Sequence, residues 1–164
     1  MSNQSLLLAV GLALVGFFFR LSEVFFGWLD IAFYIYLLLV LIAIFIGLRE
    51  TYLQENSTNF NILFKGAMKP AALFIVLVGL LQIYYFKEFN PGYFDEDIAE
   101  MIAEAEANNY TKEQISVIIK NMRQFTHHPI VFSTMQLFAL LFISLAYGAI
   151  STFIFIKVKV FRTF

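Results

Sequence analysis

Four uncharged, largely apolar stretches alternate with polar segments along the chain, at residues 6–19, 31–48, 71–86 and 130–156. An α-helix needs about 20 mostly apolar residues, at about 1.5 Å each, to cross a hydrocarbon core of about 30 Å. The first stretch reaches this length only if its helix continues past Arg20 and Glu23. The pattern therefore predicts one all-α membrane domain over residues 1–164, with transmembrane helices at about 6–26, 31–48, 70–86 and 130–156.

The segment ahead of the third span has a pattern of its own. Its apolar residues recur at helical spacing, at Phe60, Leu63, Phe64 and Ala67. We predict that residues 59–69 form an amphipathic helix on the membrane surface and that Pro70 bends the chain into the membrane. Pro129 suits the first turn of the fourth helix, where a missing N–H costs nothing.

The one long polar segment, residues 87–128, predicts two amphipathic helices at about 94–107 and 112–125. The first has an apolar stripe at Ile98, Met101, Ile102 and Ala105, and the second repeats this spacing at Ile115, Ile118, Ile119 and Met122. Thr111 and Gln114 match a capping box at the start of the second helix. We predict an extracytoplasmic helical hairpin between spans three and four. It serves either as a cap folded on the bundle or as a docking surface for a partner or a cation.

Acidic residues gather on the first of these two helices. The candidate partner surface consists of Asp95, Glu96, Asp97, Glu100 and Glu104. A helix macrodipole favours acids in a first turn, so the first three also have an ordinary structural explanation. The spacing of a calcium-binding loop is missing.

Basic residues predict the orientation of the spans. Six of them flank the side of the membrane that holds both termini, against two acids: Arg49, Lys65, Lys69, Lys157, Lys159 and Arg162. The opposite side carries five basic residues against ten acids. Since short cytoplasmic segments are enriched in Lys and Arg, we expect both termini in the cytoplasm of a cell with an inner membrane. We expect an aromatic belt at the outer face, formed by Trp28, Tyr84, Tyr85 and Tyr93.

Composition limits the possible functions. Hydrophobic residues make up 60% of the 164 residues and charged residues 14%, so the excess apolar surface must meet lipid. The net charge of −1 gives no reason to expect a nucleic-acid partner. The chain has no cysteine, and it lacks the common nucleotide-binding, hydrolase and zinc-protease motifs. Adjacent His127 and His128 lack the spacing of metal sites, so we predict no catalytic, cofactor or metal site.

Polar residues within the spans are the candidate intramembrane sites, namely Arg20, Glu23, Gln82 and Gln136. Arg20 and Glu23 lie three residues apart and can pair on one helix face, and Arg20 can also extend toward the outer interface. We predict that Gln82 and Gln136 face the bundle interior and bond to each other.

The order of motifs resembles a known family. Residues 47–52 (GLRETY) close the second span, residues 59–67 (NFNILFKGA) lead into the third, and residues 90–93 (NPGY) precede the acidic segment. This order is similar to that of the DUF4199 family, small four-span membrane proteins of Bacteroidota. The resemblance implies an inner-membrane location and this architecture, and it implies no mechanism.

These observations leave three functional hypotheses. The leading one is a non-enzymatic accessory or scaffold subunit in envelope biology, in contact with lipid and with a membrane protein or a second copy of the chain. The second is an oligomeric channel or small transporter, because rows of small residues allow close helix approach. The third is an enzyme acting on lipid headgroups at the outer interface, with its reactive groups drawn from Arg20, Glu23, Asp95, Arg123, His127 and His128.

Overall fold

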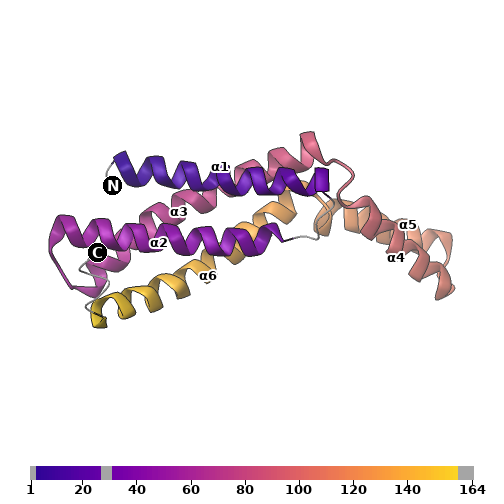
Figure 1. Ribbon diagram of the computed structural model, residues 1–164. Coiled ribbons are helices and arrows are strands. Elements are labelled where there is room, and N and C mark those ends of the chain that lie inside the picture. The colour runs from indigo at the N-terminus through magenta and orange to yellow at the C-terminus, as the bar shows by residue number, and fades with distance from the viewer. Residues whose placement is uncertain (1–2, 27–30, 159–164) are drawn as a thin grey trace.

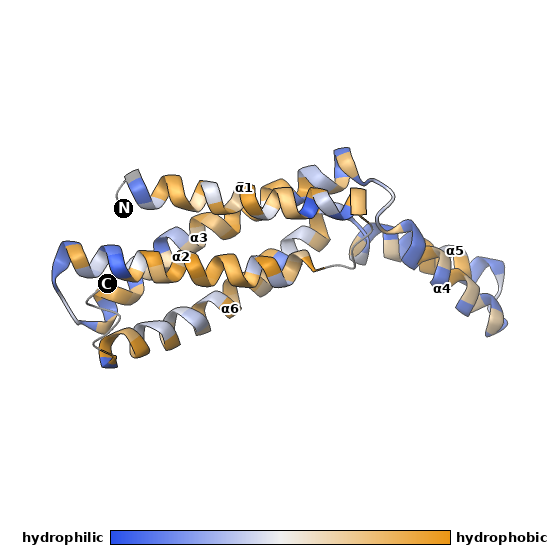
Figure 2. Cartoon of the chain, viewed as in Figure 1, coloured by the Kyte–Doolittle hydropathy of each residue, from blue (hydrophilic) through white to orange (hydrophobic). Residues whose placement is uncertain are grey.

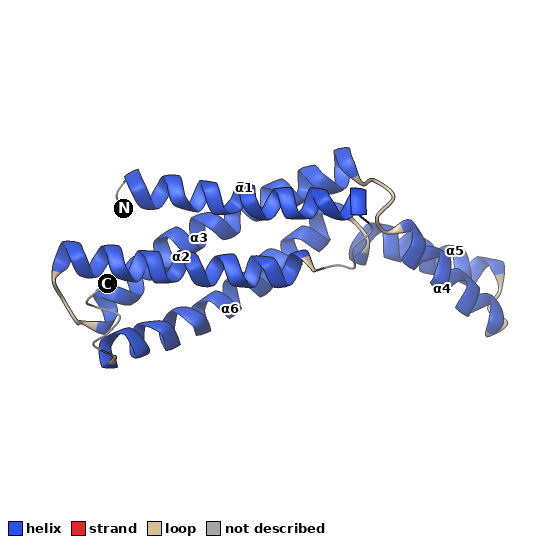
Figure 3. Cartoon of the chain, in the orientation of Figure 1, coloured by secondary structure: helices blue, strands red, loops and turns tan. Residues whose placement is uncertain are grey.

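The computed structural model describes residues 3–26 and 31–158, and its regular elements within these ranges are all helical (Figure 3). They follow one another as α1 (Asn3–Phe26), α2 (Ala32–Glu55), α3 (Phe60–Tyr84), η1 (Tyr85–Phe89), α4 (Asp95–Ala107), α5 (Lys112–Asn121), η2 (Met122–Thr126) and α6 (Pro129–Lys157). The elements η1 and η2 are single π-helical turns that extend α3 and α5. The predicted all-α fold class is confirmed.

Four helical segments are long and apolar enough to cross a membrane: Gln4–Phe26, Ala32–Glu55, Phe60–Phe89 and Pro129–Lys157. The third of these contains α3, which packs against α1, α2 and α6 and so forms the centre of the bundle (Figure 1). Apolar side chains also cover the outside of the bundle, where Leu7 and Phe142 are each 68% exposed (Figure 2). Lipid is the solvent that accommodates such a surface, so the chain is a multi-pass membrane protein.

The bundle has two different ends (Figure 1). The start of α1, the α2–α3 connection and the end of α6 lie together at one end, which we call the terminal end. The helices α4 and α5 lie side by side and project from the opposite end, which we call the α4–α5 end. Polar residues concentrate at these two ends, and the apolar middle separates them (Figure 2).

The helix α3 corrects one prediction. Residues 59–69 do not form a separate surface helix, because α3 begins at Phe60 and runs through Pro70 without a break. The Asn59 side chain caps this start by accepting hydrogen bonds from the backbone N–H groups of Asn61 and Ile62 at 2.9 and 3.4 Å. The helix is therefore part of the packed bundle from its first turn.

A close crossing with α2 explains why Pro70 does not break α3. Proline has no N–H, so it cannot donate the helical hydrogen bond to the carbonyl of Gly66. The helix α2 packs directly on this carbonyl: a Cβ added to Gly47 would lie 2.6 Å from the Gly66 oxygen and 2.9 Å from the Cα of Ala67. Contacts with a neighbouring helix of this kind make an internal proline tolerable in a membrane span.

The projecting helices agree with the sequence pattern in most respects. The capping box forms, because Thr111 Oγ1 accepts from the N–H of Gln114 at 3.3 Å and Gln114 Oε1 accepts from the N–H of Thr111 at 2.8 Å. Ile98 and Ala105 are buried, but Met101 is 42% exposed and leaves the predicted stripe. One neighbouring helix covers only a narrow stripe of α4, and Met101 lies beyond it.

Candidate functional site

A buried ion pair lies at the α4–α5 end of the bundle. Arg20 Nη1 lies 2.7 Å from Glu23 Oε2, and Arg20 is only 1% exposed. Three aromatic rings surround the guanidinium, with its Cζ atom 4.9 Å from the centre of the Tyr85 ring, 5.2 Å from Phe86 and 4.8 Å from Tyr93. A desolvated cation over an aromatic face is stabilised by about 2 kcal/mol. We call these five residues the arginine cage.

The arginine cage joins several elements. Arg20 and Glu23 share one face of α1, whereas Tyr85 and Phe86 come from the π-helical turn η1. Glu23 Oε1 accepts a hydrogen bond from the N–H of Ala32 at 3.1 Å, so its negative charge lies at the positive end of the α2 dipole. Asn90 Nδ2 donates to the Tyr85 hydroxyl at 3.2 Å, which fixes the chain as it leaves η1. The pair therefore holds α1, α2 and the end of α3 together.

The cage confirms one prediction and corrects two. The predicted Arg20–Glu23 pair forms, but Arg20 does not extend toward the interface, because the three rings and the carboxylate enclose it. Tyr85 does not belong to an outer aromatic belt, since it is buried in the cage. The belt residue Trp28 lies outside the described residues, as do Lys159 and Arg162 of the charge count.

The helices α4 and α5 rest on an aromatic cluster next to the cage. Phe86 of the cage lies 5.3 Å from Phe94 and 5.5 Å from Phe132, and Phe94 lies 5.2 Å from Phe132, between ring centres. Ile98 of α4 and Met122 of η2 are buried against this cluster. The base of the projecting helices is therefore packed against the bundle.

The two intramembrane glutamines meet as predicted. Gln82 Nε2 of α3 donates to Gln136 Oε1 of α6 at 2.6 Å, and Gln82 is buried. Bonds of this kind between membrane helices contribute about 0.6 kcal/mol on average. Their geometry is that of a contact between α3 and α6.

The acids of the candidate partner surface remain in solvent. Every one of them is exposed, namely Asp95, Glu96, Asp97, Glu100 and Glu104. The two that meet opposite charges do so loosely, with Asp95 3.8 Å from Arg123 and Asp97 3.6 Å from the ring of His127. Within residues 3–26 and 31–158, no group of three His, Asp or Glu side chains is placed to hold a metal ion. The surface is therefore charged and largely unneutralised.

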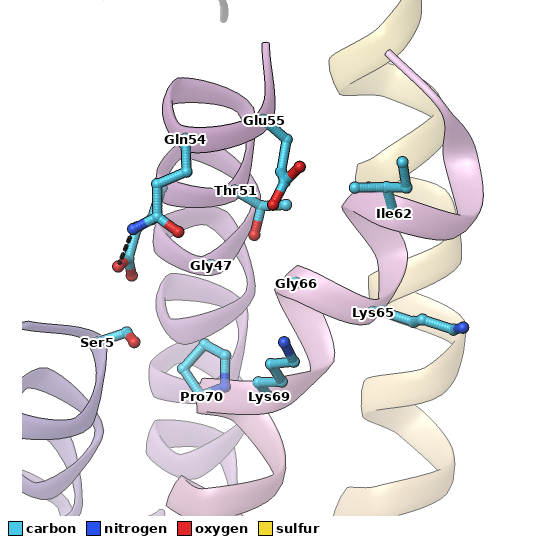
Figure 4. A pocket seen from close by; sticks show the side chains of 11 residues that line it. Ser5, Gly47, Thr51, Gln54, Glu55, Ile62, Lys65, Gly66, Lys69 and Pro70 are labelled. Carbon is cyan, nitrogen blue, oxygen red and sulfur yellow. Dashed lines mark hydrogen bonds between the residues drawn. The ribbon is translucent and has the colours of Figure 1, made fainter. Parts of the chain in front are cut away.

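A polar pocket at the terminal end was not found by sequence reasoning. It has a volume of about 190 Å³ and lies between the start of α1, the end of α2 and the start of α3 (Figure 4). Its floor is the close crossing of α2 and α3, where a Cβ on Gly66 would overlap Thr51. Its wall includes the charged residues Glu50, Glu55, Lys65 and Lys69. The signal available in the sequence was the spacing of small residues four apart, Gly47 with Thr51 and Gly66 with Pro70.

Comparison with known proteins places the chain in a family. A family model described as a protein of unknown function, DUF4199, matches residues 5–157. The chain belongs to the DUF4199 family. No curated protein and no solved structure matches it. The two segments that carry the DUF4199 resemblance in the sequence, residues 47–52 and 59–67, both contribute to the wall of the pocket.

Proposed function

We propose that this protein is an accessory or scaffold subunit of the inner membrane, and that it presents α4 and α5 to a partner outside the cytoplasm. The basic residues of the terminal end support this orientation, because Arg49, Lys65, Lys69 and Lys157 all flank the spans there. In this orientation both termini face the cytoplasm.

One observation carries the proposal: a charged helical pair projects beyond the membrane-spanning bundle and is packed at its base (Figure 1). The acids of α4 are exposed along the pair, whereas Ile98 and Met122 hold it to the aromatic cluster. An element that is held in place but leaves its charges in solvent is well suited to contact another molecule, because little ordering is needed on binding.

The chemistry of α4 indicates the kind of partner. Its exposed acids favour a basic surface on a membrane protein, and complementary charge accelerates association and selects among partners. The Asp95–Arg123 contact is long and exposed on both sides, so it offers little competition to such a partner.

The test is crosslinking in native membranes followed by mass spectrometry. One variant neutralises the surface, with Asp95→Asn, Glu96→Gln, Asp97→Asn, Glu100→Gln and Glu104→Gln. Its control neutralises two exposed residues of α5, with Lys112→Gln and Glu113→Gln. We expect the crosslinked partners of the wild type to persist in the control and to be lost from the α4 variant. Recovery of the same partners with all three proteins would refute the assignment of α4 as the contact surface.

A further inference from the structure

The pocket at the terminal end has the character of a binding site for a small group that carries both charges. Lys69 lies on one side of the Gly66 backbone and Glu55 on the other, and both side chains turn toward the hollow, whereas Lys65 points away from it (Figure 4). Within the described part of the chain, none of these three residues forms an ion pair. The pocket therefore holds opposite charges that do not neutralise each other.

The order of these charges follows the membrane normal. Lys69 directly precedes Pro70 and the uncharged run of α3, and Gly47 of α2 packs against Pro70 at this level. Glu55 ends α2, about 12 Å further out along the axis at the usual helical rise. Glu50 lies between these levels and accepts a hydrogen bond from Gln54 at 3.0 Å. The cation is thus nearest the hydrocarbon and the carboxylates are nearer the water.

A phosphoethanolamine headgroup has the complementary order, with its phosphate next to the glycerol and its ammonium further out. A cavity of about 150 Å³ holds a benzene molecule. A pocket of about 190 Å³ therefore accepts one phosphate joined to one short amine, and it is too small for a sugar phosphate headgroup. Pockets between helices at the membrane surface are established places for headgroup binding.

From these observations we propose that the pocket binds the headgroup of phosphatidylethanolamine, with Lys69 on the phosphate and Glu55 and Glu50 on the ammonium. A primary ammonium has three N–H donors for these carboxylates, whereas a trimethylated choline has none. A glycerol headgroup brings no cation to the carboxylates, so an anionic lipid is repelled by them.

The test is native mass spectrometry of the full chain in detergent, with dioleoyl phosphatidylethanolamine, phosphatidylglycerol or phosphatidylcholine added. We expect the wild type to retain the ethanolamine lipid about tenfold more strongly than the other two, since a hydrogen bond to a charged group is worth about one such factor. Lys69→Gln should lower this retention about tenfold. Glu55→Gln should weaken the ethanolamine lipid and strengthen phosphatidylglycerol, a reversal that misfolding does not produce.

The matched controls are Lys120→Gln and Glu113→Gln, which remove the same charges from exposed positions on α5. We expect both to bind as the wild type does. Equal retention of the three lipids, or an unchanged preference in Lys69→Gln and Glu55→Gln, would overturn the proposal. Soluble phosphoethanolamine binding as tightly as the lipid would also overturn it, because the ligand would then be a free solute.

Discussion

The two ends of the bundle use charge in opposite ways. At the α4–α5 end, Arg20 and Glu23 are buried together, and each already has its counter-charge within 2.7 Å. At the terminal end, Lys69 and Glu55 face a hollow and form no ion pair among the described residues. A charge taken out of water must be neutralised where it lies, whereas a charge that borders a polar pocket can remain solvated.

This difference teaches where to look for structure and where to look for ligands. The arginine cage fastens α1, α2 and α3 and supports the base of α4, so its chemistry is consumed by the fold. The pocket leaves its charges available, and its floor is backbone from two glycines. Variants at the two ends should therefore differ in what they change, stability at one end and binding or packing at the other.

The largest effect is expected from breaking the cage. Arg20→Met removes the cation and leaves the Glu23 carboxylate buried, and removal of one partner from a buried pair costs about 3–5 kcal/mol. Thermal unfolding in detergent should show this loss. The double variant Arg20→Met, Glu23→Leu should recover part of it, because no unpaired charge remains. A single variant as stable as the wild type would show that the cage does not hold the bundle together.

An intermediate effect is expected at the floor of the pocket. Gly66→Ala places a methyl group against Thr51 and the backbone of α2, and overpacking of this kind costs about 1–3 kcal/mol. The control is Gly11→Ala, whose new methyl group has no heavy atom within 4 Å. It should be stabilising by up to about 1 kcal/mol through helix propensity. Equal thermal stability of the two variants would contradict the close crossing of α2 and α3.

Several of these features were predictable from local sequence rules. The ion pair follows from a three-residue spacing, the glutamine bond from two isolated polar residues, and the capping box from Thr111 and Gln114. The contact of Pro70 with α2 was not predictable, because its outcome depends on a glycine 23 residues earlier in the chain. The arginine cage likewise depends on Tyr85 and Tyr93, whose pattern alone suggested a belt in the interface.

The smallest effect is expected from the exposed charges of α4. Asp95→Asn removes a contact of 3.8 Å between two exposed side chains, and exposed pairs contribute about 0–1 kcal/mol. Its thermal stability should differ from the wild type by about 0.5 kcal/mol or less. A loss as large as that of Arg20→Met would mean that the acids of α4 are structural and would remove the contrast drawn above.

The account depends most on the placement of the two ends on opposite sides of the membrane. The chain has no cysteine, so single cysteines at Thr58→Cys and Ala107→Cys, both exposed positions, give an unambiguous readout. The measurement is labelling with a membrane-impermeant maleimide in intact spheroplasts. We predict labelling at position 107 before lysis and at position 58 only after it. Labelling of both positions before lysis, or of neither, would contradict the account.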